Sequence, residues 1–252
     1  MSRPGDHRVV LITGASSGLG EEMARQFAAL GYDLALCARR TDRLEALADE
    51  IRSVTGRRVD TAALDVTDST AVGSVFHEFA QRTGQIDRIV VNAGIGKGAP
   101  LGTGRADANI ATAMTNFVGA LAQTEAALEI FRRQGHGHLV LISSMSALRG
   151  MRRSMTTYAA TKAGLASLAE GLRSENIQGL DVSVIHPGYI RSEMNAHVEQ
   201  KTRFMVDTVT GVRAMVKAVE KRRAKAYVPA WPWLPLGIAM KILPLQIVRR
   251  LI

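Results

Sequence analysis

Cysteine is nearly absent from the 252-residue chain, and so are long apolar runs. The single cysteine, Cys37, cannot form an internal disulfide bond, so the sequence does not indicate an oxidising compartment. Every apolar run is too short to span a bilayer without interruption, and the polar first residues do not resemble a signal peptide. We therefore expect a cytoplasmic protein.

Aromatic residues are also scarce, at 5% of the chain, and they show no stacking pattern that would suit nucleic-acid bases. The net charge of +9 comes entirely from residues 201–252, which hold 11 of the 32 Lys/Arg and 2 of the 23 Asp/Glu. Residues 1–200 are balanced in charge. A nucleic-acid-binding protein is therefore the least favoured class, despite a sequence pI of about 10.2.

Short apolar runs alternate with amphipathic segments along most of the chain. Helices are predicted between the runs, including a long one over 107–133 and one from Tyr158 to about Asn176. This alternation predicts one α/β domain with a doubly wound, mostly parallel seven-stranded sheet and helices on both faces. The predicted strands lie at 8–12, 32–38, 59–64, 86–91, 138–143, 182–185 and 226–228.

A glycine-rich turn, TGASSGLG at residues 13–20, follows the first predicted strand and precedes a helix. A strand, a glycine-rich turn and a helix in this order form a dinucleotide-binding arrangement. The glycines let the backbone approach a pyrophosphate, and the helix start offers free N–H groups. We predict that a dinucleotide cofactor contacts this turn through Gly14, Ser16, Ser17, Gly18, Leu19 and Gly20.

Two arginines, Arg39 and Arg40, follow the second predicted strand, which ends at Ala38. A carboxylate at this position would hold the ribose 2′-hydroxyl of NAD, whereas a guanidinium suits a 2′-phosphate. The sequence therefore favours NADP(H) as the cofactor. The alternative is that both arginines lie at the solvated start of a helix.

Polar residues end two further strands. Asp65 and Asn92 stand where ligands bind in parallel sheets, but Asp and Asn also form turns with their own backbone, so both interpretations stay open. His136 and His138 flank Gly137 without a third ligand nearby in the sequence, and we predict no metal site.

Tyr158 and Lys162 are four positions apart in a predicted helix and therefore share one face. A cation near a phenol favours the phenolate and lowers its pKa from about 10, which makes the phenol a useful proton donor. A surface pair on a helix gives the same pattern, so the pair alone is weak evidence.

Taken together, these motifs resemble the short-chain dehydrogenase/reductase family over residues 8–228. The resemblance implies a single-domain Rossmann fold over residues 1–252. It also implies an NADP(H)-dependent enzyme that interconverts a small-molecule carbonyl and a secondary alcohol by hydride transfer. The matching motifs are TGASSGLG, Asp65, NAG at 92–94, Asn116, ISS at 142–144, YAATK at 158–162 and HPGYI at 186–190.

The resemblance also implies residue roles. Tyr158 would be the acid/base. Lys162 would bind the nicotinamide ribose and lower the Tyr158 pKa. Ser144 would bond the substrate oxygen, and Asn116 would support a water-linked proton path. Further cofactor contacts would come from Asp65, Val66, Asn92, Ala93, Gly94, Pro187, Gly188, Ile190 and Ser192.

Ser144 precedes Tyr158 by 14 positions, one more than is frequent in the family, so Ser143 and Ser146 are neighbouring candidates. The resemblance further implies a homodimer or homotetramer that pairs through the helix at 107–133 and the Tyr158 helix. An alternative function is a cofactor-sensing binding protein that kept the fold and has little catalysis. Such a protein would be expected to have lost the tyrosine or the lysine, and both are present here.

Residues 229–252, PAWPWLPLGIAMKILPLQIVRRLI, form an apolar, basic extension in which Pro232, Pro235 and Pro244 exclude one spanning helix. The favoured interpretation is that this extension folds over the substrate pocket or a partner subunit. The alternative is peripheral membrane contact, with tryptophans at the headgroup level and Lys241, Arg249 and Arg250 facing anionic lipid. The second location would suit a lipophilic substrate.

Overall fold

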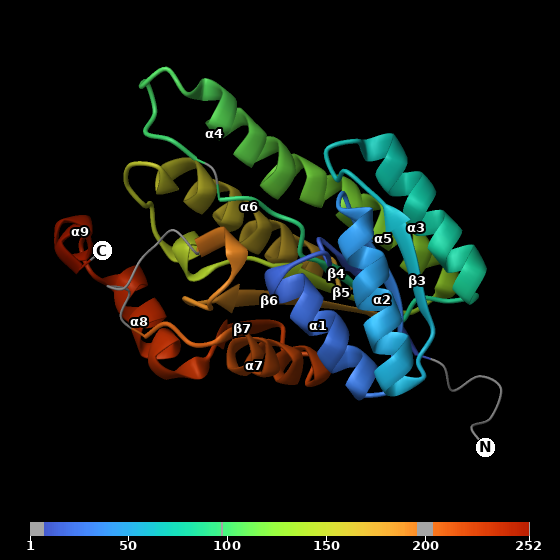
Figure 1. The fold of residues 1–252 in the computed structure, drawn as a ribbon. Helices are drawn as coiled ribbons and strands as arrows, with labels where there is room; N and C mark the ends of the chain where they lie inside the picture. Colours follow the sequence, from blue (N-terminus) through green and yellow to red (C-terminus); the bar gives the residue numbers. More distant parts are fainter. Residues whose placement is uncertain (1–7, 97, 196–203, 252) are drawn as a thin grey trace.

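The protein is described by a computed structural model that covers residues 8–96, 98–195 and 204–251, with the backbone alone for 249–251. Seven parallel strands form one sheet in the order β3-β2-β1-β4-β5-β6-β7 (Figure 1). Because all seven strands run parallel, their carboxyl ends lie along the same edge of the sheet. The strands are β1 (Val9–Thr13), β2 (Asp33–Ala38), β3 (Val59–Ala63), β4 (Arg88–Val91), β5 (Gly137–Ile142), β6 (Leu180–Pro187) and β7 (Lys225–Val228).

Helices cover both faces of the sheet. Within β1, Val10 and Ile12 join the core on one face and Val9 and Leu11 join the core on the other, because successive strand side chains alternate. The doubly wound parallel sheet predicted from the sequence is therefore confirmed. One face packs against α1 (Gly18–Ala29), α2 (Thr41–Thr55) and α7 (Thr208–Glu220), and the other against α3 (Ser69–Thr83), α5 (Gly119–Gln134) and α6 (Met155–Ser174).

The long helix predicted over 107–133 is interrupted. It consists of α4 (Ala106–Ala113), a π-helical turn at Met114–Val118, and then α5. Gly119, the first residue of α5, lies against the backbone of the loop after β3, since a Cβ at Gly119 would stand 2.6 Å from the Val66 carbonyl oxygen. A π-turn holds one more residue than an α-turn, so it changes the direction of the side chains around it.

The C-terminal extension forms α8 (Ala230–Ile242) and α9 (Leu245–Leu251), which Pro244 separates. Helix α8 contains Pro235 and departs from helical backbone angles at Trp231. The prolines thus divide the extension into short helices, as the sequence predicts.

A buried polar cluster lies at the amino-terminal edge of the sheet. Arg88 donates from Nε to His138 Nδ1 (3.0 Å) and from Nη1 to Glu220 Oε1 (2.6 Å). His138 Nε2 then faces Ser183 Oγ at 2.8 Å and donates to it. Burial lowers the pKa of His138 to about 3, and the neighbouring Arg88 charge acts in the same direction. His138 is therefore neutral in the folded protein, with both ring nitrogens bonded.

This cluster should make the protein sensitive to acid. An unfolded histidine binds a proton below a pH of about 6.5, whereas folded His138 does not, so stability should fall as the pH drops below that value. We expect His138→Gln to flatten this decline by about 1 kcal/mol per pH unit between pH 6.5 and 5. Urea unfolding measured at several pH values checks this. The exposed neighbour His136→Gln is the control, and equal slopes for wild type and His138→Gln would contradict the assignment.

Candidate functional site

The residues predicted to act together gather at the carboxyl-terminal edge of the sheet, around the ends of β1, β4, β5 and β6. The strand order reverses direction between β1 and β4. Ligands of doubly wound proteins bind at such a reversal, outside the carboxyl ends of the strands.

Tyr158 and Lys162 lie one turn apart on α6, as their spacing predicts. The buried Lys162 Nζ donates to the Ile142 carbonyl oxygen (2.8 Å) and lies 5.9 Å from the centre of the Tyr158 ring. The lysine is thus tied to the end of β5, beside the phenol.

Burial shifts the pKa values of both members of this pair. Burial raises the pKa of the Tyr158 phenol, and a hydrogen bond with Ser144 opposes that shift. Burial lowers the pKa of Lys162 to about 8. For Tyr158, burial is the larger of these two causes. The phenol therefore stays protonated at neutral pH.

The three candidate serines occupy different environments. Ser143 is buried, and its hydroxyl donates to the Lys162 carbonyl oxygen (2.7 Å), so it links β5 to α6. Ser144 points toward Tyr158 and accepts a bond from the Ser146 N–H (3.1 Å). The Ser144 carbonyl oxygen also accepts a bond from His186 Nδ1 (3.0 Å). Of the three, Ser144 is the one whose hydroxyl is hydrogen-bonded to the phenol.

Asn116 is fully buried in the π-helical turn. The Ile95 N–H donates to Asn116 Oδ1 (2.7 Å), and Asn116 Nδ2 donates to the Ile95 carbonyl oxygen (2.8 Å). Gly94 adjoins both Asn116 and Lys162, since a Cβ there would stand 3.2 Å from Asn116 Oδ1 and 3.5 Å from Lys162 Nζ. The π-turn thus brings Asn116 next to Lys162 across a residue without a side chain.

The glycine-rich turn packs tightly against the end of β4. Gly14 has a φ of 65°, and a Cβ there would lie 2.9 Å from the Ala93 Cα. A Cβ at Gly20 would lie 2.4 Å from the Gly14 carbonyl oxygen and 2.7 Å from Asn92 Nδ2. The Ser17 hydroxyl, just before α1, is bonded by Arg40 rather than by the first turn of the helix. The glycines leave these positions of the turn without side chains, and the first N–H groups of α1 have no side-chain cap. Both features suit the binding of a pyrophosphate.

The two arginines after β2 point to different places. Arg40 donates from Nη2 to Ser17 Oγ (2.5 Å) and from Nε to Ser16 Oγ (3.3 Å), so it lies over the glycine-rich turn. The Arg39 side chain is 69% exposed and approaches Asp65 at 3.8 Å. The structure thus brings Arg40, and not Arg39, to the turn.

Three other residues predicted to contact the cofactor make contacts within the fold itself. Asp65 Oδ1 accepts bonds from the Thr67 N–H (3.0 Å) and hydroxyl (2.8 Å), which lower its pKa and form the turn that the sequence left open. Val66 is buried, and Leu19 packs against the core at the start of α1.

The loop after β6 lies over the glycine-rich turn. Beyond Pro187, the Gly188 N–H donates to the Val228 carbonyl oxygen (2.9 Å). Ile190 is buried, and the Ser192 Cβ would lie 3.4 Å from a Cβ added at Gly18. The loop after β6 and the glycine-rich turn, both predicted to contact the cofactor, are therefore in contact with each other.

Helix α8 packs over the loops that follow β5 and β6. The buried Trp233 packs edge to face on Tyr189, with ring centres 5.5 Å apart, and covers Gly188. Arg149, just after the 3-10 turn Met145–Leu148, donates to the Leu243 carbonyl oxygen (3.0 Å). The extension is thus anchored beside the predicted substrate site of its own chain.

Sequence reasoning missed two residues near the turn, Arg43 and Glu193. Glu193 accepts from Arg43 Nη1 (2.6 Å) and from Arg40 Nη1 (3.1 Å). Arg43 follows Arg40 by one helical turn, which is a usable signal. No sequence signal points to Glu193, because the arginines that it contacts lie about 150 positions away in the chain.

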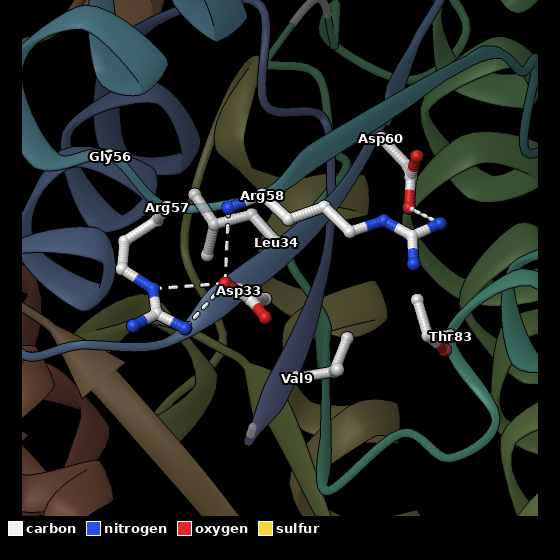
Figure 2. A pocket seen from close by; sticks show the side chains of 8 residues that line it. All are labelled: Val9, Asp33, Leu34, Gly56, Arg57, Arg58, Asp60 and Thr83. Carbon is white, nitrogen blue, oxygen red and sulfur yellow. Dashed lines mark hydrogen bonds and ion pairs between the residues drawn. The ribbon is translucent and has the colours of Figure 1, made fainter. Parts of the chain in front are cut away.

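A pocket of about 390 Å³ lies at the opposite edge of the sheet, where β1, β2 and β3 begin (Figure 2). Its charged side chains are paired, Arg57 with Asp33 (2.7 Å) and Arg58 with Asp60 (2.8 Å). Because it is remote from Tyr158 and internally neutralised, it is not part of the candidate site.

Comparisons with known proteins agree with the sequence motifs and the fold. The model of the short chain dehydrogenase family matches residues 8–203. An uncharacterized oxidoreductase of Mycobacterium tuberculosis is 52% identical over 243 residues, which cover 96% of each chain.

Two solved structures extend the similarity to the whole fold. A short-chain dehydrogenase from Sphingobium yanoikuyae in complex with NADPH has a TM-score of 0.81 at 28% identity and covers 94% of this chain and 97% of its own. One from Burkholderia phymatum in complex with NAD has a TM-score of 0.83 at 20% identity, covers 99% and 97%, and shows the fold alone. With the family model matching most of the chain, this protein belongs to the short-chain dehydrogenase/reductases and is an oxidoreductase of that family.

Proposed function

We propose that the protein is an NADP(H)-dependent oxidoreductase that interconverts a carbonyl and a secondary alcohol, with Tyr158 as the acid/base. The observation that supports this most is the grouping of the Tyr158 phenol, the Ser144 hydroxyl and the buried Lys162 ammonium beside a glycine-rich turn. The alternative, a cofactor-sensing protein with little catalysis, shares the turn but does not require this grouping.

In the reduction direction, a bound nicotinamide supplies the hydride. Ser144 bonds the carbonyl oxygen as charge develops on it, and Tyr158 gives that oxygen its proton. Lys162 would hold the nicotinamide ribose, and Asn116, which lies next to Lys162 across Gly94, would support a water-linked path by which the proton is replaced.

Removal of the phenol hydroxyl should abolish turnover and preserve cofactor binding. We expect Tyr158→Phe to lower kcat by about 10²- to 10⁴-fold, the usual contribution of a positioned acid/base. NADPH binding, measured by calorimetry, should stay within about twofold, because Tyr158→Phe keeps the ring. A panel of ketones and loss of NADPH absorbance provide the rate. Unchanged turnover would exclude Tyr158 as the acid/base, and an inactive wild type that binds NADPH would favour the cofactor sensor.

Alanine variants of the three serines complete this experiment. Ser144→Ala should cause the largest loss of kcat, because only its hydroxyl is bonded to Tyr158. Ser143→Ala should act mainly on stability through the bond to Lys162, and Ser146→Ala should change little. A larger kcat loss in Ser146→Ala than in Ser144→Ala would reverse the assignment.

The preference for NADP(H) is supported by Arg40. Its guanidinium lies over Ser16 and Ser17, and no carboxylate ends β2. Solved relatives carry NADPH in one case and NAD in another, so the family alone does not decide the cofactor. Arg39, the other arginine predicted to read the phosphate, is exposed beside Asp65 and would contribute less.

The two arginines can be separated by substitution. We expect wild type to bind NADPH more tightly than NADH, and Arg40→Ser to weaken NADPH by about tenfold, since a charged hydrogen bond is lost, with NADH little changed. Arg39→Ser should have a smaller effect, and Arg39→Asp should reduce the preference by placing a carboxylate where NAD binds. Fluorescence titration with both cofactors provides the values. Equal affinity of wild type for NADH and NADPH would refute the assignment.

The C-terminal extension supports a lipophilic substrate and peripheral membrane contact. No helix among the described residues is long and apolar enough to cross a membrane. On α8, Trp231 and Ile242 are 78% and 76% exposed, and Lys241 is exposed between them in the chain. Arg249 and Arg250, predicted to face lipid, have side chains outside the described residues. An apolar face with a cation suits an anionic membrane surface.

Oligomer formation is supported by a stripe of exposed apolar side chains away from α8. Exposed side chains recur at helical spacing along α4, the π-turn and α5, at Ile110, Met114, Val118 and Leu121. This stripe lies in the segment predicted to pair two copies, and a homodimer or homotetramer would cover it.

A double variant on α8 tests the membrane proposal, and light scattering of the same proteins tests the oligomer proposal. Truncation at Pro229 would uncover Gly188, so we choose Trp231→Ser with Ile242→Ser, which changes only exposed positions. Wild type should float with anionic liposomes at low salt, and the double variant should not. Light scattering should give the same dimer or tetramer for both chains. Wild type that stays soluble, or that is monomeric at micromolar concentration, would contradict the membrane or the oligomer proposal, respectively.

A further inference from the structure

The segment Ser192–Met194 crosses the cofactor side of the molecule and contacts two loops. Ser192 lies against Gly18 in the glycine-rich turn, where the Ser192 Cβ would be 3.4 Å from an added Cβ. Met194 lies against Gly96 in the loop after β4, where its Cγ would be 3.1 Å from an added Cβ. Glu193 lies between these two contacts in the chain, and its carboxylate reaches Arg43 on α2.

The segment has its own internal bonds. Asn195 Oδ1 accepts from the Ser192 N–H (2.8 Å), and Asn195 Nδ2 donates to the Ile190 carbonyl oxygen (2.7 Å). Ile190 is buried beneath it. The position of the Glu193 backbone is thus defined by groups other than its own carboxylate, so a change in that carboxylate should leave the segment folded.

The Glu193 carboxylate is held by two guanidinium groups. Each of its oxygens accepts one N–H, from Arg40 at 3.1 Å and from Arg43 at 2.6 Å. These bonds lower the pKa of Glu193, with the Arg43 bond the larger cause. The carboxylate is therefore ionised at neutral pH.

Arg40 uses three of its five N–H groups in the contacts described above. Its Nε and Nη2 bond Ser16 and Ser17, and Nη1 bonds Glu193. Another oxyanion that reaches both Arg40 and Arg43 would lie beside a carboxylate of the same charge sign. Two such anions repel, so each weakens the binding of the other to this pair.

We propose that Glu193 competes with the 2′-phosphate of NADP(H) for Arg40 and Arg43, and thereby sets how strongly the protein prefers NADP(H) over NAD(H). This inference rests on the proposed role of Arg40 in binding that phosphate. NADH carries no 2′-phosphate and leaves the Glu193 bonds in place. NADPH exchanges its phosphate for the carboxylate, so part of its binding energy is used to break the two ion pairs.

The test is the binding of four ligands to wild type and Glu193→Gln by calorimetry. Glutamine keeps the size of the side chain and removes its charge. We expect Glu193→Gln to bind NADPH on the order of 5-fold more tightly, as two exposed ion pairs no longer oppose it, and NADH within about twofold. The fragment 2′,5′-ADP should follow NADPH, and 5′-ADP should follow NADH, which places the effect at the 2′-phosphate.

Glu50→Gln is the matched control. Glu50 lies on α2, is paired with Arg25 at 2.7 Å, and loses the same charge in the same substitution. It should leave all four affinities unchanged. An equal gain in both variants would assign the effect to net charge and overturn the proposal. Thermal melting of each variant confirms that it is folded.

The outcomes separate this inference from the proposed function. If wild type prefers NADPH and Glu193→Gln shows the same or a weaker preference, the competition is refuted and the NADP(H) proposal stands. Glu193 would then position the arginines for the phosphate. If wild type shows no preference and Glu193→Gln gains one for NADPH, the competition is supported and the NADP(H) preference of the natural protein is refuted.

Discussion

The contact between the glycine-rich turn and the end of β4 is the constraint on which the rest of the site depends. Thr13 Oγ1 accepts the N–H groups of both Asn92 and Ala93, at 3.0 and 3.1 Å, and Asn92 Nδ2 donates to the Thr13 carbonyl oxygen at 2.9 Å. These bonds join β1 and β4 where the strand order reverses. Because Gly14 has no side chain, the turn can settle directly on Ala93. The chain beyond Ala93 then reaches Asn116 through Ile95, so one close backbone approach positions both the cofactor turn and the proton path.

Two buried cations lie at opposite edges of the same sheet, and their surroundings differ. Arg88 is paired with Glu220 and bonded to His138, which compensates its loss of water. Lys162 is bonded to a backbone carbonyl oxygen, and its pKa falls to about 8. The first arrangement stabilises a fixed charge, whereas the second leaves a charge that a small change in environment can shift. A cation of the second kind suits a site where protons move.

The sequence predicted the features that depend on apolar runs and on helix periodicity. The strands and the two-sided cover follow from short apolar runs that alternate with amphipathic segments. The shared face of Tyr158 and Lys162 follows from the helical repeat of about 3.6 residues. The π-turn at Asn116 did not follow, because one added residue is invisible to a pattern of apolar positions. The glycine-rich turn was predictable because its order between a strand and a helix has a physical meaning of its own.

Other features depend on which way a side chain turns at the end of a strand. Ser143 and Ser144 are neighbours on an extended backbone, so Ser143 faces the Lys162 carbonyl oxygen and Ser144 faces the Tyr158 phenol. Arg39 and Arg40 separate in the same way, one toward solvent and one toward the turn. Sequence places such pairs within one residue, and only the structure distinguishes their members. Glu193 is harder still, because its contacts depend on where a distant loop crosses the molecule.

The packing of Trp233 on Gly188 has a consequence for protein engineering. A Cβ at Gly188 would lie 2.1 Å from the indole ring, so the loop that follows β6 and the first turns of α8 must change together. In a chimera with the C-terminal extension of a relative, the new extension would pack in the same place only if it offers a flat side chain above Gly188. Any graft meant to alter substrate scope would therefore have to carry the β6 loop and the extension as one unit.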